Sequence, residues 1–454
     1  MTRPLPTVRT LLTTFLAAVL LLLAPGPARA QSTTNDPDQD LFDFFLGDPR
    51  DAESISSTPV MDMEVDDHGR LLVAYGVIDG ADGTARVEVV VRTPGVGWSK
   101  LASMTIDAPG GYGPGTIVKS VSVAVVSAAE GIDDNNFGFV TAVFEQKGSD
   151  WLVYQSGSLK TAWKPLAPRD LVLTGVPKKA VTDPTFIAPS IAVIPTDPGS
   201  FKKYVVAIAC AMPGTVPGDS AIKLVWMDFF TPGYFGPELY VVAGRGSKVL
   251  TGNFGRPSLA VDAQNGKWGV AFDNLTEPRV QVISGDAGDQ PSSMAKIFET
   301  GPDDHHPTLR GSKGEVNLLT LGRPKDGAAP PAWELKAYEG YLYQPNSFLA
   351  LGQVDDQCRT PADVDIRGSD VFAAASCFDD SGRNYRISVF EFKRTVLLNL
   401  VTRMEDVPSF ATRQPRMAVA PVGPTPYFAV GFANSRSFPV PGGVGGAAAV
   451  MLDP

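Results

Sequence analysis

The sequence predicts an all-β protein, a seven-bladed β-propeller with a six-bladed ring as the alternative, that is exported from the cell that makes it. Three observations carry this prediction: a strand pattern that recurs at a fixed phase, frequent helix-breaking residues, and an apolar segment near the N-terminus. The chain of 454 residues contains 45 Gly and 39 Pro, which disfavours long helices and favours many short strands.

The N-terminal 30 residues have the three parts of a signal peptide. Arg3 and Arg9 make the start positive, an apolar run extends from Leu11 to Leu23, and Ala28-Arg29-Ala30 places small residues at a cleavage site. The run is shorter than the roughly 20 residues that cross a bilayer, although a retained membrane anchor is the alternative. We therefore expect a secreted or periplasmic protein with no transmembrane segment after cleavage.

The charge of the chain argues against nucleic-acid partners. The net charge is −10, and removal of residues 1–30, which hold three Arg and no acidic residue, makes it −13. An acidic protein without a basic stretch repels nucleic acid and anionic lipid. We expect a monomer that binds a glycan or a protein partner and no nucleic acid.

A Pro followed by a short alternating strand recurs along the chain at intervals of 50 to 70 residues. The copies begin at Pro59, Pro189, Pro257, Pro307, Pro361 and Pro415, and a degenerate copy, Ser120–Val125, has Lys119 in the Pro place. Each is followed by a turn, a more apolar second strand and a third strand. Such a repeat is typical of propellers, whose four-stranded blades bury their faces on one another.

The two ends of the chain predict how the ring closes. The last copy has a third strand that ends near Leu452, which leaves no fourth strand, while the apolar run 41–46 belongs to no other blade. We expect 41–46 to pair as the outer strand of the final blade; a surface helix is the alternative. The predicted organisation is a signal peptide at 1–30, an N-terminal segment at 31–57 and a propeller domain at 58–454.

The blade repeats resemble those of the sialidase-like propeller superfamily. The resemblance rests on the phrases Arg256–Phe272 and Ala188–Val193, and it covers nearly the whole mature chain as a repeat pattern, without the catalytic signature. It implies that a ligand lies over the central axis. In sialidases three arginines hold the substrate carboxylate, and Phe254-Gly255-Arg256-Pro257 is similar to the Arg-Ile-Pro signature of that family.

Residues just ahead of the inner-strand Pro should converge near the axis. These candidate ligand-binding residues are Arg256, His305, His306, Arg359 and Arg413. A ring of such side chains suits a carboxylate or sulfate, since Arg binds these groups bidentately; pairing of each Arg with an acid of the next blade is the alternative. The loops between second and third strands add carboxylates, a pair of which could serve as acid and base on a glycoside, with solvated loop charges as the alternative. These carboxylates are Asp79, Asp82, Glu145, Asp273, Glu277, Asp379 and Asp380.

The cluster Asp303-Asp304-His305-His306 is the densest polar run of the chain. Asp303, Asp304 and His306 are candidate ligands of a metal ion, with hydrogen bonding within a turn as the alternative. No other cofactor is expected. Cys358 and Cys377 are 19 residues apart and predict a disulfide, whereas Cys210 lies in an apolar run and predicts a buried thiol.

Three functions remain open on these residues. The first is a non-catalytic recognition propeller that binds a glycan or protein on its axial face. The second is a polysaccharide hydrolase or lyase that uses Asp or Glu with Arg256 and the His305–His306 pair. The third is a structural surface protein. The sequence identifies no catalytic residue.

Overall fold

A computed structural model describes residues 41–42, 61–78, 85–106, 117–126, 136–146, 149–164, 171–177, 188–195, 204–213, 220–228, 238–288, 290–312, 314–324, 332–367, 370–378, 385–393, 400–404, 415–419, 428–440 and 443–453. These residues belong to one compact unit, Asp40–Pro454. The predicted signal peptide, most of the segment 31–57, residues 43–46 of the predicted closing strand, and Arg413 lie outside them.

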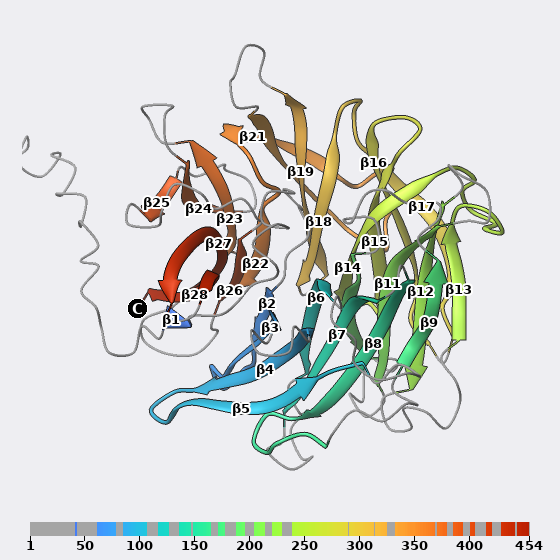
Figure 1. Cartoon of the computed structure of the whole chain (residues 1–454). Coiled ribbons are helices and arrows are strands. Elements are labelled where there is room, and N and C mark those ends of the chain that lie inside the picture. The colour runs from blue at the N-terminus through green and yellow to red at the C-terminus, as the bar shows by residue number, and fades with distance from the viewer. Residues whose placement is uncertain are drawn as a thin grey trace, which may run out of the picture. The chain divides into compact units, whose positions relative to one another are not determined.

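The described residues form antiparallel sheets and no helix, a β-propeller-like fold (Figure 1). The first three sheets take four consecutive strands each. They are β2 (Met61–Val65), β3 (Leu71–Ile78), β4 (Ala85–Thr93) and β5 (Gly97–Met104); β6 (Ile117–Val126), β7 (Phe137–Gln146), β8 (Ser149–Ser158) and β9 (Leu171–Pro177); and β10 (Ser190–Pro195), β11 (Tyr204–Pro213), β12 (Ser220–Asp228) and β13 (Glu238–Ala243).

The pattern of consecutive strands continues to the C-terminal part of the chain. The strands are β14 (Phe254–Asp262), β15 (Lys267–Asn274), β16 (Arg279–Asp286) and β17 (Ser292–Glu299); β18 (His305–Ser312), β19 (Glu315–Pro324), β20 (Trp333–Gly340) and β21 (Leu349–Cys358); β22 (Asp363–Arg367), β23 (Asp370–Phe378), β24 (Tyr385–Lys393) and β25 (Leu400–Met404); and β26 (Arg416–Val419), β27 (Phe428–Val440) and β28 (Gly443–Asp453). Strand β1 (Leu41–Phe42) pairs with β28, Leu41 opposite Ala449.

The first strand of each sheet, here called its inner strand, faces the middle of the unit in Figure 1. Each inner strand contacts the next one along the chain, from β2 through β6, β10, β14, β18 and β22 to β26, and β26 in turn contacts β2. Apolar clusters fill the spaces between neighbouring sheets. One of them joins Met61 and Met63 of β2 to Ala418 of β26 and Ala429 of β27, so the first and last sheets share a core.

Side chains at one equivalent position of each inner strand link it to its neighbour. We call these residues the side-chain ring: Asp62, Ser122, Ser190, Ser258, Thr308, Asp363 and Arg416. The Ser190 hydroxyl, for example, accepts the Leu259 N–H at 2.9 Å. Backbone groups at the inner edges lack a ladder partner from the next sheet, and such buried groups must be satisfied. Every ring residue except Arg416, which pairs with Asp62, supplies such a hydrogen bond.

In two sheets the Pro of the repeat lies inside the inner strand and not at its start, where the repeat predicts it. Strand β14 begins at Phe254 and β18 at His305, before Pro257 and Pro307. The pairing register shifts between Gly255 and Ser258, and again between His305 and Thr308. A bulge leaves residues unpaired, so a Pro that lacks an N–H is tolerated inside the strand.

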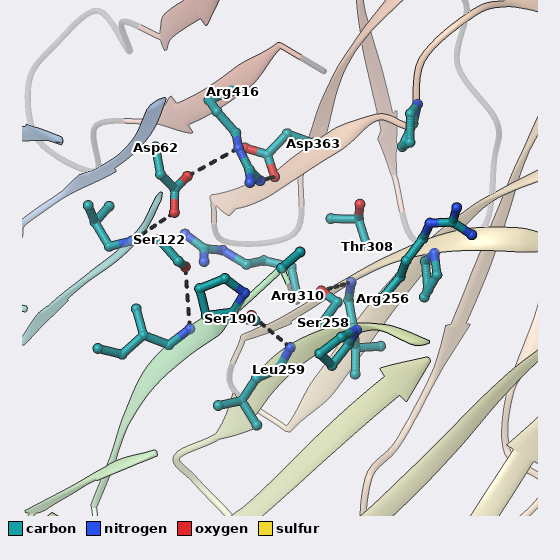
Figure 2. A pocket seen from close by; sticks show the side chains of 18 of the residues that line it. Asp62, Ser122, Ser190, Arg256, Ser258, Leu259, Thr308, Arg310, Asp363 and Arg416 are labelled. Carbon is teal, nitrogen blue, oxygen red and sulfur yellow. Dashed lines mark hydrogen bonds and ion pairs between the residues drawn. The ribbon is translucent and has the colours of Figure 1, made fainter. Parts of the chain in front are cut away.

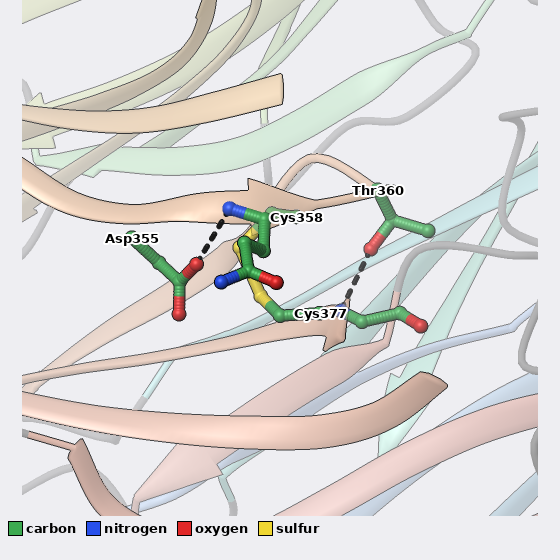
Figure 3. Close-up of a disulfide and its surroundings, with 6 residues drawn as sticks. Asp355, Cys358, Thr360 and Cys377 are labelled. Carbon is green, nitrogen blue, oxygen red and sulfur yellow. Dashed lines mark hydrogen bonds between the residues drawn. A yellow bond between two sulfur atoms is a disulfide. The ribbon is translucent and has the colours of Figure 1, made fainter. Parts of the chain in front are cut away.

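Two neighbouring sheets are continuous with each other through a disulfide. Strand β21 pairs with β23 at Cys358 and Cys377, and the two cysteines are bonded, with their Cα atoms 3.9 Å apart. Figure 3 shows Thr360 beside the bond, where its hydroxyl accepts the Ser376 N–H at 2.9 Å. The sheets β18–β21 and β22–β25 therefore form one eight-stranded sheet.

Candidate functional site

A pocket with a cavity volume of about 110 Å³ lies among the inner strands, and we call it the inner-strand pocket. Its wall takes residues from every inner strand named above. The charged and imidazole side chains in the wall are Asp62, Arg256, His306, Arg310, Asp363 and Arg416. Figure 2 shows most of these side chains and the hydroxyl residues of the side-chain ring converging on one space. The repeat therefore brings together residues that lie up to 354 positions apart.

Arg256 and His306 enter the pocket from two bulges of the same kind. Their φ angles are 49° and 54°, in the left-handed region that residues with a side chain rarely occupy. Each directly precedes a Pro, and a Pro normally forces the residue before it into an extended backbone conformation. Strain of this kind costs on the order of 1–3 kcal/mol per residue and persists only where the surroundings enforce it.

Asp273 on β15 holds both strained residues. Its Oδ2 lies 2.9 Å from Arg256 Nη1, and its Oδ1 accepts the backbone N–H of His306 at 2.8 Å. Burial raises the pKa of Asp273, while Arg256 and the two hydrogen bonds oppose that rise. The carboxylate therefore fixes the positions of both side chains at the pocket.

The His306 ring is neutral at physiological pH. Burial lowers its pKa well below the ordinary value, and the charge of Arg256 lowers it further. The ring lies edge-on to His305, with centroids 4.8 Å apart, and Nδ1 of His306 is buried without a hydrogen-bond partner among the described residues. A neutral imidazole offers one donor and one acceptor nitrogen.

On the opposite wall, Arg416 lies between two carboxylates. Its Nε is 3.4 Å from Asp62 Oδ1, and its Nη1 is 3.4 Å from Asp363 Oδ1. The other oxygens of the two acids accept backbone N–H groups, from Val123 and Met417 respectively. Burial raises the pKa of Asp62, and Arg416 opposes this. Both acids are therefore held in place by the ring.

Arg310 links three sheets. From β18 it reaches Glu64 on β2, with Nη2 2.6 Å from Oε2, and Asp365 on β22, with Nε 3.5 Å from Oδ1. Burial raises the pKa of Glu64 to about 7, although Arg310 opposes the rise. Burial also raises the pKa of Asp365. Because the partners of Arg310 come from two other sheets, its ion pairs cross the middle of the unit.

The structure brings together some of the predicted ligand-binding residues. Arg256 and His306 line the inner-strand pocket, and His305 contacts His306 and also the ring of Trp333, 6.5 Å away between centroids. Arg359 lies next to the disulfide, where its N–H donates to the Ser376 carbonyl at 2.7 Å. It is not in the described wall of the pocket, and Arg413 lies outside the described residues.

Two of the three candidate metal ligands, Asp303 and Asp304, have other partners. Asp304 is fully buried, with Oδ1 2.9 Å from Lys336 Nζ and Oδ2 accepting the Tyr338 hydroxyl at 2.5 Å. Asp303 lies 3.3 Å from Arg323 Nη2. Among the described residues, the groups close enough to share an ion are Asp66–Asp67–His68 and Asp355–Cys358–Cys377. A metal role for Asp303, Asp304 and His306 stays a prediction.

The sequence reasoning missed the hydroxyl residues and acids of the side-chain ring. A signal for them exists: each inner strand has a polar residue at the same phase, such as Ser122 within Ser120–Val125 or Ser190 after Pro189. A polar residue that recurs at a buried phase needs a hydrogen-bond partner.

No family model matches this chain, and no curated protein matches it. Among solved structures it is similar to a prolyl endopeptidase, with 13% identity and a TM-score of 0.42 over 99% of this chain and 56% of that chain. It is also similar to Trypanosoma rangeli sialidase, with 10% identity and a TM-score of 0.40 over 87% of this chain and 54% of that chain.

A third similar structure is a GH43 endo-arabinanase from Bacillus licheniformis, with 14% identity and a TM-score of 0.31 over 59% of this chain and 92% of that chain. This chain thus spans little more than half of the prolyl endopeptidase and sialidase chains. Identities and TM-scores this low carry no argument about this chain.

No helix in the described part of the chain has the length and apolar character needed to span a bilayer.

Proposed function

We propose that this chain is an exported recognition protein that binds a glycan in the inner-strand pocket without changing it chemically. The observation that carries the proposal is the pocket itself, in which fixed polar side chains from all the inner strands converge. A hollow lined by polar side chains suits a small polar group better than it suits the flat surface of a protein partner. The export signal at 1–30 is part of this proposal.

The proposal includes a particular architecture. The sheets make seven blades in a closed ring, with β1 as the outer strand of the last blade. Support comes from the contact of β26 with β2, from the ion pair of Arg416 with Asp62, and from the pairing of Leu41 with Ala449. In such a ring the inner-strand pocket lies on the axis. We take the protein to be a monomer.

Non-catalytic binding is favoured because the pocket carboxylates already have structural partners. Asp62 and Asp363 each accept a backbone N–H from the next sheet and share Arg416. Asp273 likewise holds Arg256 and His306. A general acid or base must exchange protons with a ligand, and these groups are engaged in holding the ring and the bulges together.

The test is a binding screen with soluble neutral and acidic polysaccharides by affinity electrophoresis. We expect at least one polysaccharide to retard the protein, and Arg256→Ala and His306→Ala to weaken that retardation at least tenfold. Arg245→Ala, which changes an exposed arginine after β13, serves as the matched control. If no polysaccharide is retained, or if both pocket variants bind like the control, the proposed function is wrong.

One observation favours a second function, glycoside hydrolysis. Asp62 and Asp363 line the same pocket, and burial raises the pKa of Asp62. Hydrolysis of a glycoside requires two carboxyl groups, of which the acid has a raised pKa. Release of reducing sugar from a retained polysaccharide, lost in Asp62→Asn while thermal stability is kept, would establish this function in place of simple binding.

A further inference from the structure

We propose that the inner-strand pocket selects an uncharged sugar, and that the hydroxyls of Ser122, Ser190 and Ser258 donate hydrogen bonds to its oxygens. This inference rests on the proposed glycan-binding function and specifies the ligand of that site. Three features of the pocket support the inference. The pocket has a row of hydroxyl donors, its arginines are already paired with acidic side chains, and prolines form an apolar part of its wall.

The three serines belong to consecutive inner strands and share one geometry. Each hydroxyl oxygen accepts a backbone N–H from the next strand: Ile191 to Ser122 at 3.3 Å, Leu259 to Ser190 at 2.9 Å, and Leu309 to Ser258 at 2.9 Å. Figure 2 follows them from strand to strand along one side of the pocket. The accepted bond fixes the position of each oxygen.

A hydroxyl carries its own proton as well as acceptor lone pairs. Among the hydrogen bonds of the described residues, none uses the protons of these three serines. Thr308, at the next position of the side-chain ring, differs, because its hydroxyl donates to the Ala362 carbonyl at 2.7 Å. Ser122, Ser190 and Ser258 therefore present three donors at pocket-lining positions, matched to a ligand with several acceptor oxygens.

The charges at the pocket are already paired. Arg256 has Asp273, Arg310 has Glu64 and Asp365, and Arg416 has Asp62 and Asp363, at distances from 2.6 to 3.5 Å. His306 adds no charge, since its lowered pKa keeps it neutral. A carboxylate or sulfate on the ligand would have to compete with protein carboxylates for every one of these arginines. An uncharged ligand meets no such competition.

Prolines supply the apolar side of the pocket. Pro189, Pro257, Pro307 and Pro361 line it from four inner strands, and each precedes a residue of the side-chain ring by one or two positions. A pyranose has both a C–H face and an edge of hydroxyls. Apolar walls with a few placed polar groups are typical of small-ligand sites. The prolines fit the C–H face, and the serine donors fit the hydroxyl edge.

The side-chain ring itself suggests a substitution that removes a hydroxyl proton and keeps the hydrogen bond that the oxygen accepts. Asp62 and Asp363 occupy ring positions and accept the same kind of backbone N–H as the serines do. Ser190→Asp therefore keeps the structural acceptor and removes the donor, while Ser190→Thr keeps both. Ser99→Ala, on the exposed side of β5, is the control for a serine outside the pocket.

The experiment measures binding of methyl glycosides of glucose, galactose, mannose and arabinose, with glucuronate and galacturonate as charged counterparts, by saturation-transfer NMR and calorimetry. We expect one neutral glycoside to bind at least tenfold more tightly than its uronate. We expect Ser190→Asp to weaken binding at least tenfold at an unchanged melting temperature, and Ser190→Thr, which keeps the donor, to weaken it less than Ser190→Asp does. Ser99→Ala should change binding less than threefold. Deoxy analogues of the bound glycoside should lose affinity where a serine donates.

Tighter binding of a uronate than of its neutral counterpart would overturn this inference and leave glycan binding intact. So would wild-type affinity in folded Ser190→Asp, or deoxy analogues that all bind like the parent sugar. If Ser190→Asp does not fold, Ser258→Asp and the deoxy analogues decide. If none of the saccharides binds and no polysaccharide is retained, the proposed function fails, and this inference fails with it.

Discussion

Arg256 and Asp273 form an ion pair, with Nη1 2.9 Å from Oδ2, that joins the bulge of β14 to the neighbouring strand β15. The second oxygen of Asp273 holds the N–H of His306 on β18, so one buried carboxylate fixes two bulges. Both bulges carry a residue in the left-handed region directly before a Pro. A single side chain thus controls where the pocket presents its arginine and its imidazole.

Asp273→Ala should therefore destabilise the protein and also release Arg256 and His306 from their positions at the pocket. The change leaves Arg256 without this partner and the His306 N–H without an acceptor, and breaking a buried pair from one side costs about 3–5 kcal/mol. Asp273→Asn keeps an acceptor for the N–H and should lose less. Denaturant unfolding of both variants gives the free energies. Equal losses would mean that the N–H of His306 does not matter.

A glycine on an inner strand tests how closely the sheets pack. A Cβ added to Gly311 of β18 would overlap the carbonyl oxygen of Val261 on β14, and backbone cannot move aside as a flexible side chain can. We expect Gly311→Ala to lower the unfolding free energy by about 1–3 kcal/mol, as overpacking does. Gly301→Ala is the control, because nothing lies within 4 Å of its Cβ. Similar midpoints for the two variants in urea would refute this close packing.

The cysteines should give a simple thiol count. Cys358 and Cys377 are bonded to each other, and Cys210 is fully buried, with its pKa raised by burial to about 12. A thiol reagent at neutral pH should detect no thiol in the native protein and one after denaturation without reductant. Reduction should lower stability by about 2–4 kcal/mol. Three thiols in the denatured protein without reductant would contradict the disulfide.

Stability should fall as pH rises from about 4.5 to 7. Burial raises the pKa of Glu64 from 4.5 to about 7, so the folded state binds its proton more tightly than the unfolded state over this range. The contribution of Glu64 is fully present below the unfolded pKa and is lost as pH rises through the folded one. At 1.36 kcal/mol per unit it is on the order of 3 kcal/mol.

Glu64→Gln should flatten that pH dependence. The amide keeps an acceptor for Arg310 and does not titrate. The raised pKa values of Asp62 and Asp365 act in the same direction, so part of the slope should remain. Unfolding free energies of both proteins at several pH values provide the check. A slope unchanged by the substitution would show that Glu64 ionises normally.

The sequence predicted the strands better than their side-chain contacts. Turns and alternating runs identify hairpins locally, which is why the strand after Pro257 and the second strand that follows it were found. The bulges were missed, because a register shift depends on the partner strand. The convergence of Arg256 and His306 followed from the repeat phase, whereas Asp273 as their common partner could not be singled out among the loop carboxylates. Arg310 was missed because its partners, Glu64 and Asp365, lie on distant strands.

The side-chain ring also determines what a sheet needs in order to replace another sheet of the protein. Five of the seven ring residues accept one N–H of the next inner strand, as Ser190 does from Leu259 and Asp363 from Met417. Thr308 donates to a carbonyl instead, and Arg416 pairs with Asp62. A sheet grafted from one position to another would have to bring an acceptor at that phase and a free N–H one residue later. Farther out, some junctions have links of their own, such as the Cys358–Cys377 disulfide and the hydrogen bond from the His306 N–H to Asp273. An engineer who exchanges a sheet would therefore have to match the ring contact at each junction and, where one exists, the outer link as well.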